Sequence, residues 1–169
     1  IDLVPPERYD AIISNAGGCG SHLRHYGPLL ADDPAYAERA HQWDRKLRDV
    51  QEWLVEAGCR APSQSPFDRP AAITYHESCH LVHGQKVSRQ PRALLKLLPG
   101  VTLTELPESS WCCGSAGIYA LTQPEQAEAL LKRKVANIRT TGAEIVATAN
   151  PGCHLQIARG LRDSAANIQ

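Results

Sequence analysis

Short apolar runs alternate with longer segments of helical periodicity along this chain of 169 residues. The apolar runs have the length and composition of buried strands, and they occupy residues 9–14, 71–75, 101–106 and 144–149. Between them, apolar residues recur every three or four positions, which predicts helices over 33–58, 91–98 and 122–142, with another helix after Cys153. Four strand–helix pairs predict an α/β fold, with a parallel sheet flanked by helices in a Rossmann-like three-layer arrangement.

Capping residues define the expected ends of two helices. Asp33 and Pro34 suit the start of the 33–58 helix, and Gly58 suits its end. Thr122 and Glu125 have the spacing of a capping box, which predicts where the helix over 122–142 begins.

Two segments of the chain echo each other. Residues 10–20 align without gaps on residues 144–154, and this alignment matches Cys19 to Cys153. A match this short also arises by chance, so a duplicated module is a hypothesis. It would divide the chain at a loop rich in Pro and Ser, into the tail of a first module with its long helix (1–60) and a second module (61–169), packed as one globular unit. The first residue is not Met, and we expect a fragment of a longer protein.

Composition excludes several classes of partner. The chain has 18 basic and 18 acidic residues and a net charge of zero, which argues against binding to nucleic acid or to an acidic membrane surface. No apolar run approaches the roughly 20 residues of a membrane-spanning helix, and no signal peptide opens the chain. We therefore expect a cytoplasmic domain. At this length a core suffices for folding, so the six cysteines need another explanation.

Four of these cysteines follow strand-like runs: Cys79, the adjacent pair Cys112 and Cys113, and Cys153. Ligands of open parallel sheets bind beyond the carboxyl ends of the strands, so we expect these cysteine motifs to meet there. Thiolates select soft metals, and four of them suffice for an iron–sulfur cluster, for which we expect the 4Fe–4S type. A helix start after each cysteine would lower its pKa.

Other interpretations remain open. Four thiolates also bind zinc, although the usual CxxC pairs of structural zinc sites are missing here; in an isolated fragment, zinc or an empty site could replace a cluster. Disulfides, buried free thiols and a thiol–disulfide enzyme using the cysteine pair are further alternatives. Cys59 follows no strand and is expected to be a free thiol. Three histidines surround Cys79, and could tune or ligate a metal or be ordinary loop residues: His76, His80 and His83. No nucleotide-binding or hydrolase motif is present.

Several strings resemble one family closely. They are SNAGGCG, YHESCHLVHGQ, WCCGSAGIYALTQP and KRKVANIRTTGAEIVATANPGCHLQI. They resemble the cysteine-rich CCG domain family, which includes heterodisulfide reductase B-like proteins and the iron–sulfur subunits of lactate- and glycolate-oxidising complexes. CCGSAGIYALTQP and NPGCHLQI are most similar to the glycolate oxidase iron–sulfur subunits.

The resemblance implies a function and a ligand set. It implies an electron-transfer domain with two CCG repeats. The domain would pass electrons from a flavin subunit, which oxidises glycolate to glyoxylate, towards quinone. The complex would attach peripherally to the inner face of the cytoplasmic membrane. The family's ligands correspond to Cys79, Cys112, Cys113 and Cys153, with Cys19 as the last ligand of the preceding repeat. Family members with a noncubane pair of clusters have a final CxxC, where this chain has Gln156. The alternative is a structural zinc or docking module of a related lactate-oxidising or heterodisulfide reductase-like complex.

Overall fold

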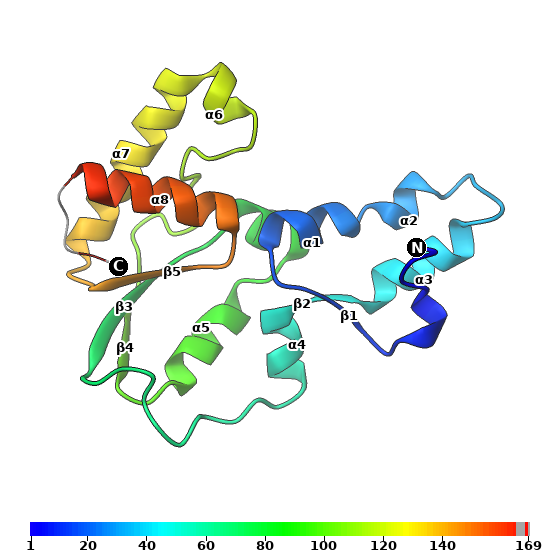
Figure 1. The fold of residues 1–169 in the computed structure, drawn as a ribbon, viewed down its shortest axis with the longest axis horizontal. Helices are drawn as coiled ribbons and strands as arrows, with labels where there is room; N and C mark the ends of the chain where they lie inside the picture. Colours follow the sequence, from blue (N-terminus) through cyan, green and yellow to red (C-terminus); the bar gives the residue numbers. More distant parts are fainter. Residues whose placement is uncertain (165–167, 169) are drawn as a thin grey trace.

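The computed structural model describes residues 1–164 and 168, and its strands form two parallel sheets (Figure 1). A three-stranded sheet has the order β4-β3-β5, and a two-stranded sheet pairs β1 with β2. The strands are β1 (Ile12–Ser14), β2 (Leu47–Asp49), β3 (Ala71–His76), β4 (Val101–Thr104) and β5 (Ile145–Thr148).

Helices connect and cover these strands. The α-helices are α1 (Gly17–Leu23), α2 (Tyr26–Leu29), α3 (Ala37–Lys46), α4 (Val50–Glu56), α5 (Arg89–Leu97), α6 (Tyr119–Thr122), α7 (Pro124–Thr140) and α8 (Pro151–Asp163), with a 3-10 helix η1 (Pro6–Arg8) and a π-helix η2 (His80–Gly84). Among the residues that the structure describes, no helix is both long and apolar enough to cross a bilayer.

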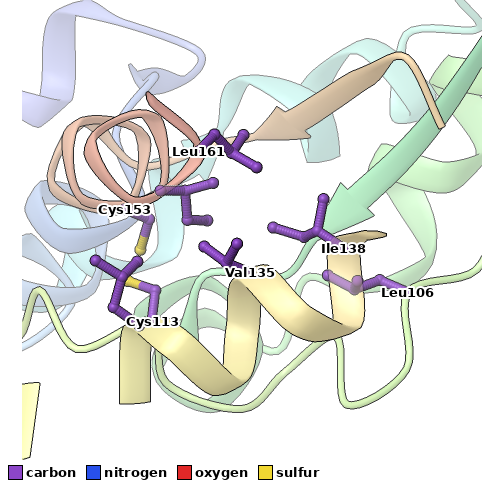
Figure 2. Packing of buried hydrophobic residues seen from close by; sticks show 8 residues of the cluster. Leu106, Cys113, Val135, Ile138, Cys153 and Leu161 are labelled. Atoms are coloured by element: carbon purple, nitrogen blue, oxygen red, sulfur yellow. The ribbon is translucent and has the colours of Figure 1, made fainter. Parts of the chain in front are cut away.

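The three-stranded sheet lies between two layers of helices (Figure 1). Helices α7 and α8 pack against each other and cover one face, while α5 contacts β4 from the other. The buried cluster under α7 and α8 is apolar except for two thiols (Figure 2); it comprises Leu106, Cys113, Leu131, Val135, Ile138, Cys153, Ile157 and Leu161. The predicted α/β fold, with parallel strands flanked by helices, is confirmed, although the strands form two sheets rather than one.

The expected helix over 33–58 is wrong. The chain forms α3, then the strand β2, then α4. Leu47 leaves the helical conformation, with φ −71° and ψ 129°, and pairs in parallel with Ile12 of β1. The Asp49 carboxylate then accepts the N–H of Gln51, and a capping box with Glu52 starts α4. The apolar periodicity continues through this break because Leu47 is buried in the strand, as it would also be on the apolar face of one continuous helix.

Two further expectations about helix starts are also wrong. The Thr122 hydroxyl donates back to the carbonyl of Ile118, so it does not cap α7, which begins at Pro124 without a side-chain cap. Helix α8 begins at Pro151, two residues before Cys153, so this cysteine lies within its first turn.

The two segments that echo each other in sequence meet in space. Helix α1 abuts the start of α8 end to end (Figure 1). The N–H of Gly17 donates to the carbonyl of Ala149 over 3.0 Å, and the N–H of Gly18 donates to the Asn150 side-chain oxygen over 3.0 Å. Side-chain and carbonyl acceptors from the second segment thus satisfy first-turn donors that an α-helix leaves unpaired.

Candidate metal centre

Three buried donors converge where the strands of the larger sheet end. The ligand atoms of His76, Cys113 and Cys153 all lie within 4.8 Å of one another. His76 is the last residue of β3, Cys113 lies in the loop after β4, and Cys153 is the third residue of α8. Figure 2 shows the Cys113 and Cys153 sulfurs directed towards each other at one end of the apolar cluster.

The other two predicted ligands lie outside this group but act on it. Cys79 and Cys112 are each half-buried, and the Cys112 sulfur accepts the N–H of Gly114 over 3.3 Å. Burial raises the pKa of Cys79, and so does the charge of Cys112. Charges on Cys79 and Cys112 also act to raise the pKa of Cys153, although other contacts lower that pKa overall. The four thiols therefore influence one another's ionisation, while their assignment as ligands stays a prediction.

The expectation that helix starts lower every thiol pKa is wrong for three of the four. Contact with the Cys113 thiol, followed by burial, raises the pKa of Cys112. Contact with Cys112 lowers the pKa of Cys113, but contact with Cys153 and burial outweigh this effect and bring it to about 11. Only the pKa of Cys153 is lowered, by the Cys113 thiol and by the Asn150 amide, whose nitrogen lies 3.5 Å from the Cys153 sulfur. In the other three thiols, burial and the neighbouring thiols outweigh the main-chain N–H groups that lower the pKa.

The loop that carries the cysteine pair is tightly constrained. Gly114 has φ +87°, a left-handed conformation that favours glycine, and a side chain there would collide with the backbone of Ala127 in α7. The loop is therefore pressed against the first turn of α7, which fixes where Cys112 and Cys113 can lie.

A buried lysine faces the same centre, and the sequence analysis missed it. Lys134 is 1% exposed, and its ammonium donates to the carbonyls of Glu108 and Ser109 in the loop before the cysteine pair. Burial lowers the pKa of Lys134, whereas the neighbouring thiols act in the opposite direction. Its position three residues after Leu131, on the apolar face of α7, was the available signal.

The remaining candidates lie elsewhere. Cys19, the third residue of α1, and Cys59 are both exposed, and neither belongs to the group of close donors. His80 and His83 are exposed, so among the three histidines around Cys79 only His76 is buried in the centre.

The residues present fit a soft metal. Thiolate sulfur with imidazole nitrogen is a donor set for zinc or for an iron–sulfur cluster. The Gly114 N–H directed at the Cys112 sulfur is the type of hydrogen bond that tunes such clusters. The arrangement is suited to holding metal with thiolates in a region shielded from water.

Comparison with known proteins supports this interpretation of the site. The sequence profile of the Cysteine-rich domain family (CCG) matches residues 73–158, which include His76, Cys79, both adjacent cysteines and Cys153. The chain belongs to this family. The match begins within β3 and ends within α8, so the CCG domain includes the sheet edge where the donors converge.

Several curated proteins are similar to the chain beyond the CCG match. It is 41% identical over 152 residues to the probable glycolate oxidase iron-sulfur subunit of Bacillus subtilis (strain 168), covering 90% of this chain and 34% of the relative. It is 36% identical over 160 residues to the glycolate oxidase iron-sulfur subunit of Escherichia coli (strain K12), covering 92% and 37%. It is 29% identical over 163 residues to lactate utilization protein A of Bacillus velezensis, covering 96% and 68%. The CCG chain thus spans about a third of the two glycolate oxidase subunits.

Proposed function

We propose that this CCG domain transfers electrons through an iron–sulfur cluster bound by Cys79, Cys112, Cys113 and Cys153. The observation that carries the proposal is the convergence of Cys113 and Cys153 at the sheet edge, with two further thiols close enough to perturb their ionisation. Two of the relatives are named iron-sulfur subunits, which supports the same cofactor here.

The protein's own residues prepare the site for such a group. When bound, an iron–sulfur cluster supplies one-electron transfer. The apolar cluster under α7 and α8 keeps water from Cys113 and Cys153, which are 2% and 4% exposed. The Gly114 N–H and the Lys134 ammonium act to lower the pKa of Cys112, against the larger raising effects of the Cys113 thiol and of burial.

The electron donor that we propose is a flavin subunit oxidising a 2-hydroxy acid, specifically glycolate to glyoxylate, and the acceptor is quinone. The similarity to glycolate oxidase subunits over about 90% of this chain supports this choice of substrate. The domain would work in the cytoplasm, at the inner face of the membrane, as part of such a complex.

Residues 1–60 would be the tail of a first CCG repeat and residues 61–169 a second repeat, with Cys19 the last ligand of the first. The matching local structure supports this division. In β1–α1 and in β5–α8, a parallel strand leads into a helix whose third residue is a cysteine, Cys19 or Cys153.

Anaerobic reconstitution tests the proposal. With iron and sulfide, the chain is expected to gain a broad visible absorbance that dithionite bleaches. Cys113→Ser is expected to abolish this absorbance, while the exposed Cys59→Ser serves as the matched control and keeps it. A Cys113→Ser protein with unchanged absorbance would show that the ligand assignment is wrong.

A structural zinc module is the second candidate, since two thiols and one imidazole within 4.8 Å also suit tetrahedral zinc. Metal analysis separates the two: about one zinc per chain without acid-labile sulfide favours the zinc module.

A further inference from the structure

We propose that His76 is itself a metal ligand of this centre, bound through a ring nitrogen beside Cys113 and Cys153. The inference rests on the proposed function only in assuming that a metal occupies the site. The imidazole would take the place of one of the four thiolates in the proposed ligand set, which gives the centre one nitrogen and three sulfur ligands.

The position of the imidazole is the first argument. His76 is 1% exposed, and its nearest ring nitrogen lies within 4.8 Å of both the Cys113 and the Cys153 sulfur. It ends β3 at the carboxyl edge of the sheet, where ligands of parallel sheets bind. No rearrangement of the fold is needed for one metal centre to contact all three side chains.

The second argument is that the ring is unsatisfied without a metal. Neither Nδ1 nor Nε2 of His76 has a hydrogen-bond partner of normal geometry among the described residues. Buried polar groups are paired in the great majority of cases, and an unpaired one is destabilising. A metal ion would take up a nitrogen lone pair and offset that cost.

The surrounding groups do not offer an alternative role. The charged group that faces the ring from α7 is the Lys134 ammonium, which is a donor only and is already held by main-chain carbonyls. The Ser109 carbonyl lies near the ring, but it already accepts the N–H of Glu77 and makes no well-formed hydrogen bond to the imidazole. The Glu77 carboxylate is turned to Arg92 and Ser109 instead. His76 therefore lacks the well-paired carboxylate or carbonyl that would identify it as an ordinary buried histidine.

A nitrogen ligand has a chemical consequence. Where imidazole replaces thiolate on iron, the centre loses negative charge and its reduction potential rises. His76 would make this centre easier to reduce than one with sulfur ligands alone, and replacing it with cysteine would shift the potential downwards.

The decisive measurement uses the wild-type chain. After anaerobic loading with iron and sulfide and reduction, pulsed electron paramagnetic resonance is expected to show a strongly coupled nitrogen, and nitrogen-15 histidine is expected to change that coupling. His76→Cys is expected to lose it, whereas His83→Ala, at an exposed position in η2, keeps it. A loaded wild-type centre with no coupled histidine nitrogen, or a coupling that survives His76→Cys, would overturn the proposal.

Cobalt binding gives a second readout that is independent of the cluster. Co²⁺ bound to the metal-free chain is expected to show both thiolate charge-transfer and nitrogen coupling. His76→Ala is expected to weaken binding by more than the factor of about 10–100 that is typical of an outer-shell partner. Circular dichroism reports whether the His76→Ala variant folds. If the variant does not fold, the nitrogen-15 histidine experiment on the wild-type chain decides whether His76 is a ligand.

The two proposals fail separately. A cluster that forms without histidine coupling removes the ligand role of His76 but keeps the proposed function. Cobalt with histidine coupling, in a chain that never forms a cluster, removes the iron–sulfur function but keeps the ligand role. A chain that binds neither metal overturns both.

Discussion

Glu77 and Ser109 are joined twice. The Glu77 main-chain N–H donates to the Ser109 carbonyl over 3.2 Å, and the Ser109 hydroxyl donates to the Glu77 carboxylate over 2.6 Å. Glu77 precedes Cys79 by two residues, and Ser109 precedes Cys112 by three. The pair therefore ties together the two loops that carry three of the proposed ligands.

Removing one of these bonds is expected to loosen both loops. Ser109→Ala removes the hydroxyl donor from a carboxylate that is 8% exposed, and hydrogen bonds to charged groups are worth about 1.5–3 kcal/mol. We expect a loss of about 2 kcal/mol in the free energy of unfolding, measured by urea denaturation of the metal-free chain. Ser110→Ala is the control, because no hydrogen bond of that hydroxyl is found within residues 1–164. Equal losses in both variants would contradict the role of the Glu77–Ser109 bond.

The same carboxylate predicts a pH dependence. Burial opposes ionisation of Glu77, but hydrogen bonds from Arg92, Ser109 and Ser88 outweigh it and hold its pKa at about 2, below the ordinary 4.5. Between these values the unfolded state binds the proton first, so stability is lost as the pH falls from 4.5 towards 2. The loss is at most about 3 kcal/mol.

Comparison with Glu77→Gln isolates this group. Urea denaturation at several pH values measures the difference in unfolding free energy between wild type and variant. We expect this difference to be constant above pH 4.5 and to shrink below pH 4.5. A difference that does not change with pH would show that Glu77 titrates normally.

Much of the fold could be predicted because the hydrophobic pattern of most segments matches the burial of their residues in the folded protein. The strands β3, β4 and β5 are short apolar runs, and each was expected within two residues of its observed end. The strand β2 could not be found by periodicity, because Leu47 continues the apolar face of α3. The capping box of Asp49 with Glu52 was the overlooked signal, since it marks a new helix start inside the supposed helix.

The candidate site could be predicted only in part. Topology alone brings strand-end residues together, and this predicted that Cys113 and Cys153 would lie close to each other. It could not single out His76 from its neighbours, because burial of the ring depends on the helices that cover the sheet. Lys134 was missed because a lysine on a helix is ordinarily exposed, and only tertiary packing buries it.

The constraint on the cysteine loop gives a third prediction. Gly114→Ala combines an unfavourable left-handed conformation with a collision against Ala127, whereas a side chain at Gly117, where φ is +57°, would meet open space. We expect Gly117→Ala to cost about 1 kcal/mol from conformation alone, and Gly114→Ala about 2–4 kcal/mol from conformation and overpacking. Urea denaturation of both metal-free variants measures the difference. Similar costs would show that the loop can move away from α7 freely.

Asn150 links the two echoing segments to the candidate metal centre, which gives the last prediction. Its oxygen accepts the Gly18 N–H, and its nitrogen lies 3.5 Å from the Cys153 sulfur. Asn150→Ala removes both contacts and is expected to cost about 1 kcal/mol of stability and to raise the pKa of Cys153, which the amide lowers.

Asn150→Asp separates the two roles. The carboxylate keeps an acceptor for Gly18 and suits the N-cap of α8, so stability is expected to hold. Its negative charge beside the thiol is expected to raise the pKa of Cys153 further than alanine does, because like charges oppose ionisation. Urea denaturation measures the stability, and the carbon resonance of labelled Cys153 followed by NMR against pH measures the thiol. An aspartate variant as unstable as the alanine variant would show that the Gly18 hydrogen bond does not hold the two segments together.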